Sequence, residues 1–252
     1  MVRGIEKFKE QFKGFEGKYS LIGGVACGLL LDDAGLEFRG TQDFDMVLIV
    51  EAMDDQFGRA IWDFIKSGEY TVREKSNGEP EFYRFMNPKD ESYPKEIELF
   101  SRRSHVLKYE EENRLTPIHI SDTISSLSAI LLNDEYYHFL TGGLTIIDGV
   151  QILNYTHIIP FKAKAWSDLK DRKSRGEQVD SKNITKHKND IFRLSQLLTG
   201  TDAVRLSDEI RTDMKTFLDA MAEEDVDLKN LHIRGRKAEI LERIAAVYGI
   251  EF

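Results

Sequence analysis

Two aspartates at the entrance of an apolar segment are the residues of this sequence best suited to chemistry. Asp43 and Asp45 are two positions apart, and residues 44–50 read FDMVLIV, the pattern of a strand buried on both faces. Side chains two apart on a strand point to the same face. Two ionised acids at that place are costly unless positive charge compensates them, and carboxylate oxygens are ligands that Mg²⁺ and Mn²⁺ prefer. The pair therefore predicts a divalent-metal site of the kind that handles phosphate groups.

A glycine pair upstream supplies the complementary feature. Gly23 and Gly24 stand between a predicted strand, residues 19–22, and a predicted helix, residues 25–31. Glycines at a helix start let backbone N–H groups approach phosphate oxygens closely, and the helix N-terminus adds partial positive charge. Asp43 follows Gly24 by nineteen positions, which is room for one helix, a loop and the return to a neighbouring strand. Either motif alone is common, but their order and spacing together favour one phosphate and metal site.

The composition indicates a globular chain. Of 252 residues, 41% are hydrophobic and only 5 are Pro, and no apolar run approaches the ~18 residues that a membrane span needs. The N-terminal segment lacks the apolar stretch of a secretory signal, and one cysteine cannot form an internal disulfide. We therefore expect a cytoplasmic protein without a membrane partner. The net charge of −9 argues against a generally basic nucleic-acid binder.

One segment departs from this acidic balance. Residues 159–193 carry ten Lys or Arg against five Asp or Glu. Such a basic island attracts phosphates, including those of RNA, although a solvated helix face is the alternative interpretation.

The elements that must position these motifs fall into two groups. Before residue 115, hydrophobic periodicity predicts helices and strands in alternation, with strands at 19–22, 44–50, 81–86 and 96–100 and helices at 5–15, 25–31 and 54–66. Later signals are mainly helical, at residues 122–132, 161–173, 186–198 and near 214–221 and 240–248, with a hairpin at 144–153. We expect an α+β fold in which residues 1–115 form a mixed sheet flanked by helices. Residues 116–252 are expected to form a mainly helical module that completes the cleft, with no Pro/Gly linker between the two.

Residues 23–50, GGVACGLLLDDAGLEFRGTQDFDMVLIV, resemble the DNA polymerase beta-like nucleotidyltransferase superfamily. In that superfamily a Gly-Gly or Gly-Ser pair at a helix start is followed by Asp-x-Asp on a strand. The Arg-x-Thr-x-Asp-x-Asp form, from Arg39 to Asp45, is most similar to the abortive-infection toxin branch called AbiEii-like. Residues 161–173 and 186–191 are similar to that branch's lysine helix and the Lys-Asp-x-x-Asp helix after it. His187 departs from the pattern, because the branch has its first acid there.

The resemblance implies a nucleotidyltransferase-type sheet with a third acid on a neighbouring strand. Glu96 and Glu98 share one face of the strand predicted at 96–100. Glu98 is favoured because it lies deeper in the strand, while Glu96, or two solvated edge glutamates, remain alternatives. The implied catalytic and metal-binding residues are Asp43, Asp45 and Glu98.

The nucleotide-binding residues implied by the same resemblance are Gly23, Gly24, Arg39, Thr41, Lys162 and Asp190. Lys162 falls on the inward stripe of its helix with Trp166, whereas Lys164 falls on the wet side. An inward lysine suits a triphosphate, although a lysine that snorkels to solvent is the alternative.

The expected function is metal-dependent transfer of a nucleoside monophosphate from an NTP to a hydroxyl acceptor, with release of pyrophosphate. The cofactor would be Mg²⁺ or Mn²⁺, and the branch implies a toxin-like enzyme acting on RNA, such as tRNA, or on a protein, with an antitoxin as partner. Two alternatives stay open. One is a non-catalytic nucleotide- or partner-binding module of a toxin–antitoxin pair, and the other is an enzyme that modifies a drug hydroxyl.

Overall fold

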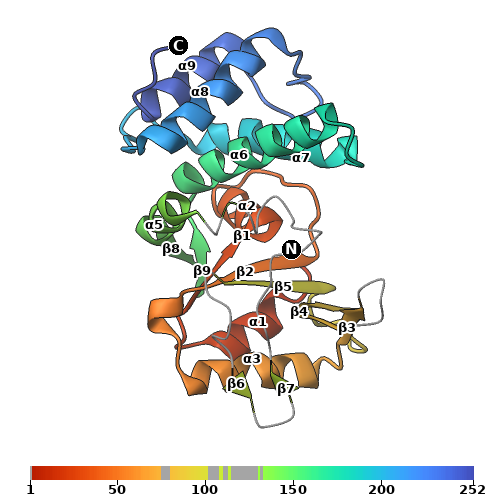
Figure 1. Cartoon of the computed structure of the whole chain (residues 1–252). Helices are drawn as coiled ribbons and strands as arrows, with labels where there is room; N and C mark the ends of the chain where they lie inside the picture. Colours follow the sequence, from red (N-terminus) through yellow and green to blue (C-terminus); the bar gives the residue numbers. More distant parts are fainter. Residues whose placement is uncertain (1, 75–79, 102–107, 110–112, 115–129, 131–132) are drawn as a thin grey trace. The chain divides into compact units, whose positions relative to one another are not determined.

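The structure is a computed structural model that describes residues 2–74, 80–101, 108–109, 113–114, 130 and 133–252 (Figure 1). The chain divides into two compact units, which are described separately. The sheet unit comprises residues 1–124 and 144–153, and the helical unit comprises residues 125–143 and 154–252. The helix predicted at 122–132 falls outside the described residues except for Ile130. In the described ranges, no helix combines the length and apolar character that crossing a membrane requires.

The sheet unit contains a seven-stranded mixed sheet in the order β3-β4-β5-β2-β1-β9-β8. Its strands are β1 Tyr19–Ile22, β2 Asp43–Leu48, β3 Thr71–Glu74, β4 Pro80–Met86, β5 Glu96–Ser101, β8 Leu144–Ile147 and β9 Val150–Leu153; β6 Lys108–Tyr109 and β7 Asn113–Arg114 form a separate pair. The helices of this unit are α1 Ile5–Phe12, α2 Gly23–Asp33 and α3 Asp55–Ser67, with the 3-10 turn η1 Val50–Ala52. The mixed sheet with helices on both faces confirms the predicted α+β class.

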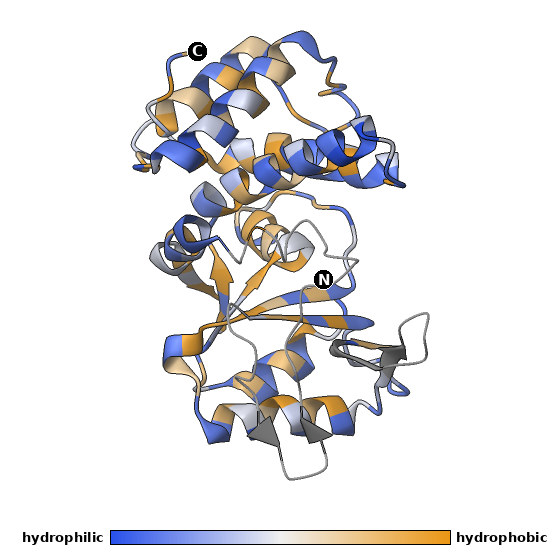
Figure 2. Ribbon diagram, viewed as in Figure 1, coloured by the Kyte–Doolittle hydropathy of each residue, from blue (hydrophilic) through white to orange (hydrophobic). Residues whose placement is uncertain are grey.

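The two faces of β2 meet different helices. Phe44 contacts Phe8 of α1, with ring centroids 5.3 Å apart, and Phe8 in turn contacts Phe64 of α3. Helices α1 and α3 therefore cover this face, while α2 packs on the other (Figure 1). Figure 2 shows that α2 is hydrophobic along most of its length, in agreement with the burial of residues 24–31. Because side chains alternate along a strand, Asp43 and Asp45 face the α2 side.

The hairpin predicted at residues 144–153 is confirmed, and it extends the sheet. Its two-residue turn consists of Asp148 and Gly149, both at positive φ, 49° and 75°. Strand β9 pairs in parallel with β1, where Leu21 is opposite Ile152. The boundary expected near residue 115 left this hairpin with the helical module, because pairing between strands so distant in sequence leaves no local pattern.

The helical unit contains helices α5 Asp134–Gly142, α6 Tyr155–Ser174, α7 Ser181–Leu194, α8 Asp208–Glu223 and α9 Lys237–Val247, with the 3-10 turn η2 Ser195–Leu197. Helix α6 packs against both α7 and α8.

Helix α6 begins earlier than residue 161, where the sequence predicts its start. Asn154 caps the helix by accepting a hydrogen bond from the backbone N–H of Thr156, at 2.8 Å, and Pro160 lies inside the helix. Proline cannot donate to the carbonyl four residues earlier, which here belongs to Thr156. The hydroxyl of Tyr248 donates to that carbonyl instead, at 2.7 Å. This replacement lets the helix continue through the proline.

Candidate functional site

Four acidic residues, Asp43 and Asp45 of β2 and Glu96 and Glu98 of β5, lie side by side in the sheet unit and are called the row of acids. Strands β2 and β5 are parallel, and the register places Asp45 opposite Glu98 and Asp43 opposite Glu96. Residues paired in this way project from the same face of a sheet. All four carboxylates therefore lie on the α2 side. The side chain of Glu98 is 12% exposed and that of Glu96 is 27% exposed.

Arg84 extends this row onto β4, where it is the register partner of Glu98. Its guanidinium forms ion pairs with both glutamates, with Glu98 through one terminal nitrogen and with Glu96 through Nε at 3.2 Å. The sequence reasoning missed Arg84. The one local signal was an arginine between Tyr83 and Phe85 in a predicted strand, and only the pairing of β4 with β5 gives that position meaning.

Gly23 begins α2 beside Asp45. The backbone of Gly23 has φ of +67°, a conformation that L side chains rarely adopt. A Cβ atom at this position would overlap Oδ2 of Asp45. The absence of a side chain at residue 23 therefore allows the Asp45 carboxylate to lie against the start of α2.

The absence of a side chain at Gly24 likewise allows the segment that precedes β2 to approach the helix closely. A Cβ atom at Gly24 would lie 2.7 Å from Oγ1 of Thr41 and 3.4 Å from a guanidinium nitrogen of Arg39. Thr41 and Arg39 therefore approach the first turn of α2. Five of the nine predicted site residues meet at this turn, namely Gly23, Gly24, Arg39, Thr41 and Asp45. Asp43 and Glu98 lie in the row of acids on β2 and β5.

The start of α2 lacks the usual capping groups. Its N-cap residue, Ile22, provides no side-chain hydrogen bond, and its first turn carries no acidic residue. Backbone N–H groups at such an end, with the partial positive charge of the helix, favour an anion. The Asp45 carboxylate lies beside Gly23 at this end of the helix.

The donor chemistry of the row fits a hard divalent cation. Asp43, Asp45 and Glu98 provide carboxylate oxygens from one face, which is the ligand type that Mg²⁺ and Mn²⁺ take. In the part of the chain that the structure describes, no three acidic, His or Cys side chains converge into a ready-formed metal site. Within the row, Arg84 holds Glu98 and Glu96 in ion pairs.

The sheet unit also contains a cavity of about 520 Å³ beside the segment between α2 and β2. Arg39 and Thr41 line one part of it, and Lys9 and Asp148, which form an ion pair, line another. The remaining wall comes mainly from α1, α2 and the segment between α2 and β2.

Lys162 and Asp190 form a buried ion pair in the helical unit. Nζ of Lys162 on α6 lies 2.7 Å from Oδ2 of Asp190 on α7, and their side chains are 5% and 0% exposed. The predicted inward position of Lys162 is confirmed by this burial. The pair satisfies both charges within the helical unit, so that its predicted role in binding the nucleotide stays a prediction.

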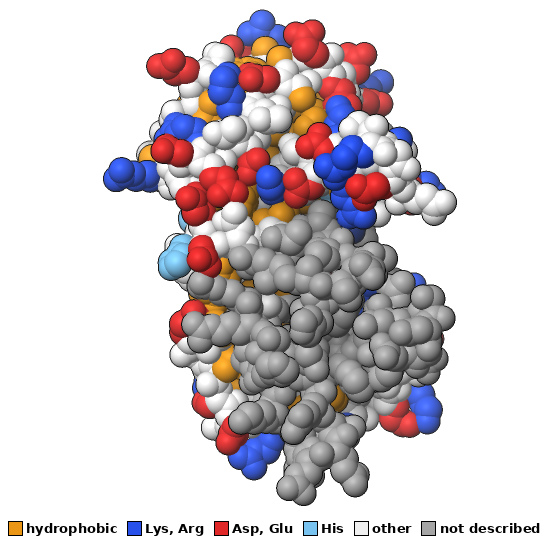
Figure 3. Space-filling view, in the orientation of Figure 1, with side chains coloured by type: hydrophobic (Ala, Val, Ile, Leu, Met, Phe, Trp, Pro, Cys, Tyr) orange, Lys and Arg blue, Asp and Glu red, His pale blue; other side chains and the backbone are white. Residues whose placement is uncertain are grey.

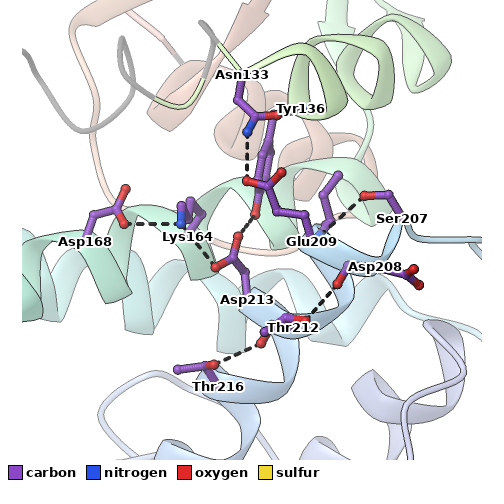
Figure 4. A network of polar contacts seen from close by, with 11 residues as sticks. Asn133, Tyr136, Lys164, Asp168, Ser207, Asp208, Glu209, Thr212, Asp213 and Thr216 are labelled. Atoms are coloured by element: carbon purple, nitrogen blue, oxygen red, sulfur yellow. Dashed lines mark hydrogen bonds and ion pairs between the residues drawn. The ribbon is translucent and has the colours of Figure 1, made fainter.

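Lys164 belongs to a different network of the helical unit (Figure 4). Its Nζ lies 3.1 Å from Oδ1 of Asp213 and 3.5 Å from Oδ1 of Asp168, and the hydroxyl of Tyr136 donates to Asp213 at 2.9 Å. Burial lowers the pKa of Lys164, but the carboxylates of Asp168 and Asp213 outweigh it, and the net shift is upward. Burial raises the pKa of Asp168, an effect that the charge of Lys164 opposes in part. These contacts tie α5, α6 and α8 together.

Much of the basic island is neutralised by nearby acids. Figure 3 shows acidic and basic side chains interspersed over the visible surface of the helical unit. Ion pairs with acids join many of the island's cations, among them Lys162–Asp190, Lys164–Asp213, Arg172–Glu177, Arg175–Glu177 and Lys188–Glu224. The surface is therefore less positive than the sequence count of this segment indicates.

Comparison with known proteins gives no relative: no protein-family model, curated protein or solved structure matches the chain.

Proposed function

We propose that this chain is a metal-dependent nucleotidyltransferase that transfers a nucleoside monophosphate from an NTP to a hydroxyl acceptor. The proposal rests above all on one juxtaposition, the Asp45 carboxylate between its register partner Glu98 and the glycine start of α2. Acids that bind a cation and backbone groups that bind phosphate are the two halves that phosphoryl transfer requires.

The acids of the row would hold the cation and assist the acceptor. Asp43, Asp45 and Glu98 are the residues that would bind Mg²⁺ or Mn²⁺, which supplies charge neutralisation at the phosphate oxygens when bound. One of these carboxylates accepts the proton of the acceptor hydroxyl. The hydroxyl oxygen then bonds to the α-phosphorus as the bond to the leaving pyrophosphate breaks.

The turn at the start of α2 would bind the phosphates. The N-cap residue, Ile22, provides no side-chain hydrogen bond to this turn, and glycine at positions 23 and 24 allows close approach. Arg39 and Thr41 lie at the same turn and add a cation and a hydroxyl donor. Positioning and charge neutralisation supply most of the rate in such reactions.

RNA is the acceptor that we propose, because the basic segment at residues 159–193 offers exposed cations such as Lys173 and Lys182. Many of its other cations are paired, so that RNA binding would be of moderate strength and sensitive to salt. An antitoxin partner is part of the same proposal and has its support in the sequence resemblance alone.

The test is incubation of the whole chain with each α-labelled NTP, Mg²⁺ and total RNA. The wild-type chain should label RNA with one or more NTPs, and Asp45→Asn should abolish the labelling. The matched control is Asp63→Asn, the same substitution at an exposed position of α3, on the other face of the sheet. Nucleotide binding without transfer would favour the non-catalytic module, and transfer that persists in Asp45→Asn would refute the assignment of the site.

A further inference from the structure

The row of acids carries its own counter-ion. Four carboxylates, of Asp43, Asp45, Glu96 and Glu98, project from one face of two adjacent strands. Like charges that face each other across strands repel, and partial burial strengthens the repulsion. Arg84 offsets it because its guanidinium reaches both glutamates from the neighbouring strand β4.

The ion pair engages the same carboxylate that the proposed metal would need. Arg84 is bound to an oxygen of Glu98, the acid opposite Asp45. A carboxylate held by a guanidinium is a poorer ligand for a cation, because the two positive groups compete for the same oxygens and repel each other. The side chain of Arg84 is 20% exposed, so part of it contacts solvent.

We propose that Arg84 is a positioning residue that competes with the divalent cation for Glu98. It offsets part of the row's negative charge, at Glu96 and Glu98, while the metal is absent, and the metal must displace it to engage Glu98. The displaced guanidinium, with its planar fork of donors, is suited to a phosphate oxygen of the arriving nucleotide. Metal and nucleotide therefore favour each other's binding through Arg84. This inference rests on the proposed function, because it needs the metal site on the same row.

The experiment is calorimetric titration of the full chain with Mn²⁺ alone, without nucleotide. Arg84→Gln removes the competitor and should bind Mn²⁺ roughly tenfold more tightly than wild type, the size of one charge-assisted contact. Arg84→Lys keeps the positive charge but lacks the planar set of guanidinium donors. Its Mn²⁺ affinity should lie between those of wild type and Arg84→Gln. Lys89→Gln is the matched control, because it removes one positive charge from an exposed ion pair with Glu69 in the same unit and should leave Mn²⁺ affinity unchanged.

The outcomes separate this inference from the proposed function. Tighter Mn²⁺ binding by Arg84→Gln, or binding by that variant alone, supports the competition. Equal or weaker binding by Arg84→Gln, when the wild-type chain binds Mn²⁺, overturns the competition and leaves the metal site standing. If none of the forms binds Mn²⁺, both the proposed metal site and the proposed function are refuted. Should Arg84→Gln fail to fold, the same comparisons apply to Arg84→Lys.

Discussion

Asp45 of β2 and Glu98 of β5 are direct register partners in a parallel pair of strands, and their carboxylates project from the face that carries the start of α2. Glu96 lies two residues away in the same row, but its partner is Asp43, nearer the entrance of the strand. Register therefore gives the two glutamates different neighbours, although both alternate onto one face. This difference separates the two candidates for the third acid.

We predict that Glu98→Gln weakens Mn²⁺ binding by about tenfold or more, because it removes the charge of the proposed ligand opposite Asp45. Glu96→Gln removes the same charge from the same face and should change the affinity by less than about threefold. Calorimetric titration of both variants makes the comparison. A larger loss with Glu96→Gln would mean that Glu96 is the third acid.

Gly23 should be intolerant of any side chain. At Gly23→Ala, the positive φ costs about 1–2 kcal/mol, and the new Cβ also overlaps the Asp45 carboxylate. Gly35→Ala is the matched control, because Gly35 has a similar φ of +71° and open space around the position of a Cβ. Urea denaturation should show that the positive φ lowers the free energy of unfolding in both variants. In Gly23→Ala alone, the free energy of unfolding should fall further. Equal losses in the two variants would show that the close approach of Asp45 is not needed for stability.

Breaking the buried ion pair of Lys162 and Asp190 should lower the free energy of unfolding. Lys162→Met leaves Asp190 charged and buried, and Arg193, a cation on the same helix, is 3.7 Å away. Such a loss costs about 3–5 kcal/mol, whereas Lys162→Met combined with Asp190→Leu should recover most of it. Lys215→Met breaks an exposed ion pair with Asp219 and should cost less than about 1 kcal/mol. Chemical denaturation checks these values, and equal effects of Lys162→Met and Lys215→Met would contradict the role of burial.

The same double variant separates folding from nucleotide binding. If Lys162 binds the triphosphate, the folded double variant should bind NTP roughly tenfold to a hundredfold more weakly than wild type. Lys164→Ala, in a separate network, should do much less. NTP titration of the two proteins decides between a ligand and a purely structural lysine. Unchanged NTP affinity in the double variant would leave Lys162 with the structural role alone.

Local sequence patterns predicted the elements that carry the site more fully than the contacts between them. A largely apolar run predicted β2, the alternation of acids and apolar residues predicted β5, and the strand over residues 19–22 matches β1. Strand β3 was missed because its four residues, TVRE, carry no alternation that distinguishes them from a loop. Arg84 and the Thr156–Tyr248 hydrogen bond both depend on partners far away in the sequence, about which local periodicity carries no information.

The pH dependence of stability should include a contribution from His157. Burial lowers the pKa of this imidazole to about 4, and its ring stacks on Phe139 with centroids 4.3 Å apart. The folded chain therefore keeps His157 neutral at pH values where the unfolded chain, with a histidine pKa near 6.5, takes up a proton. Stability is fully present above about pH 6.5 and falls as the pH drops toward 4, by up to about 3 kcal/mol. His157→Phe keeps the ring and should flatten this part of the profile, whereas His138→Gln, at an exposed position of α5, should leave the profile unchanged. Urea denaturation at pH 7, 6, 5 and 4.5 makes the comparison, and a profile of His157→Phe parallel to that of wild type would show that His157 does not stay neutral in the folded chain.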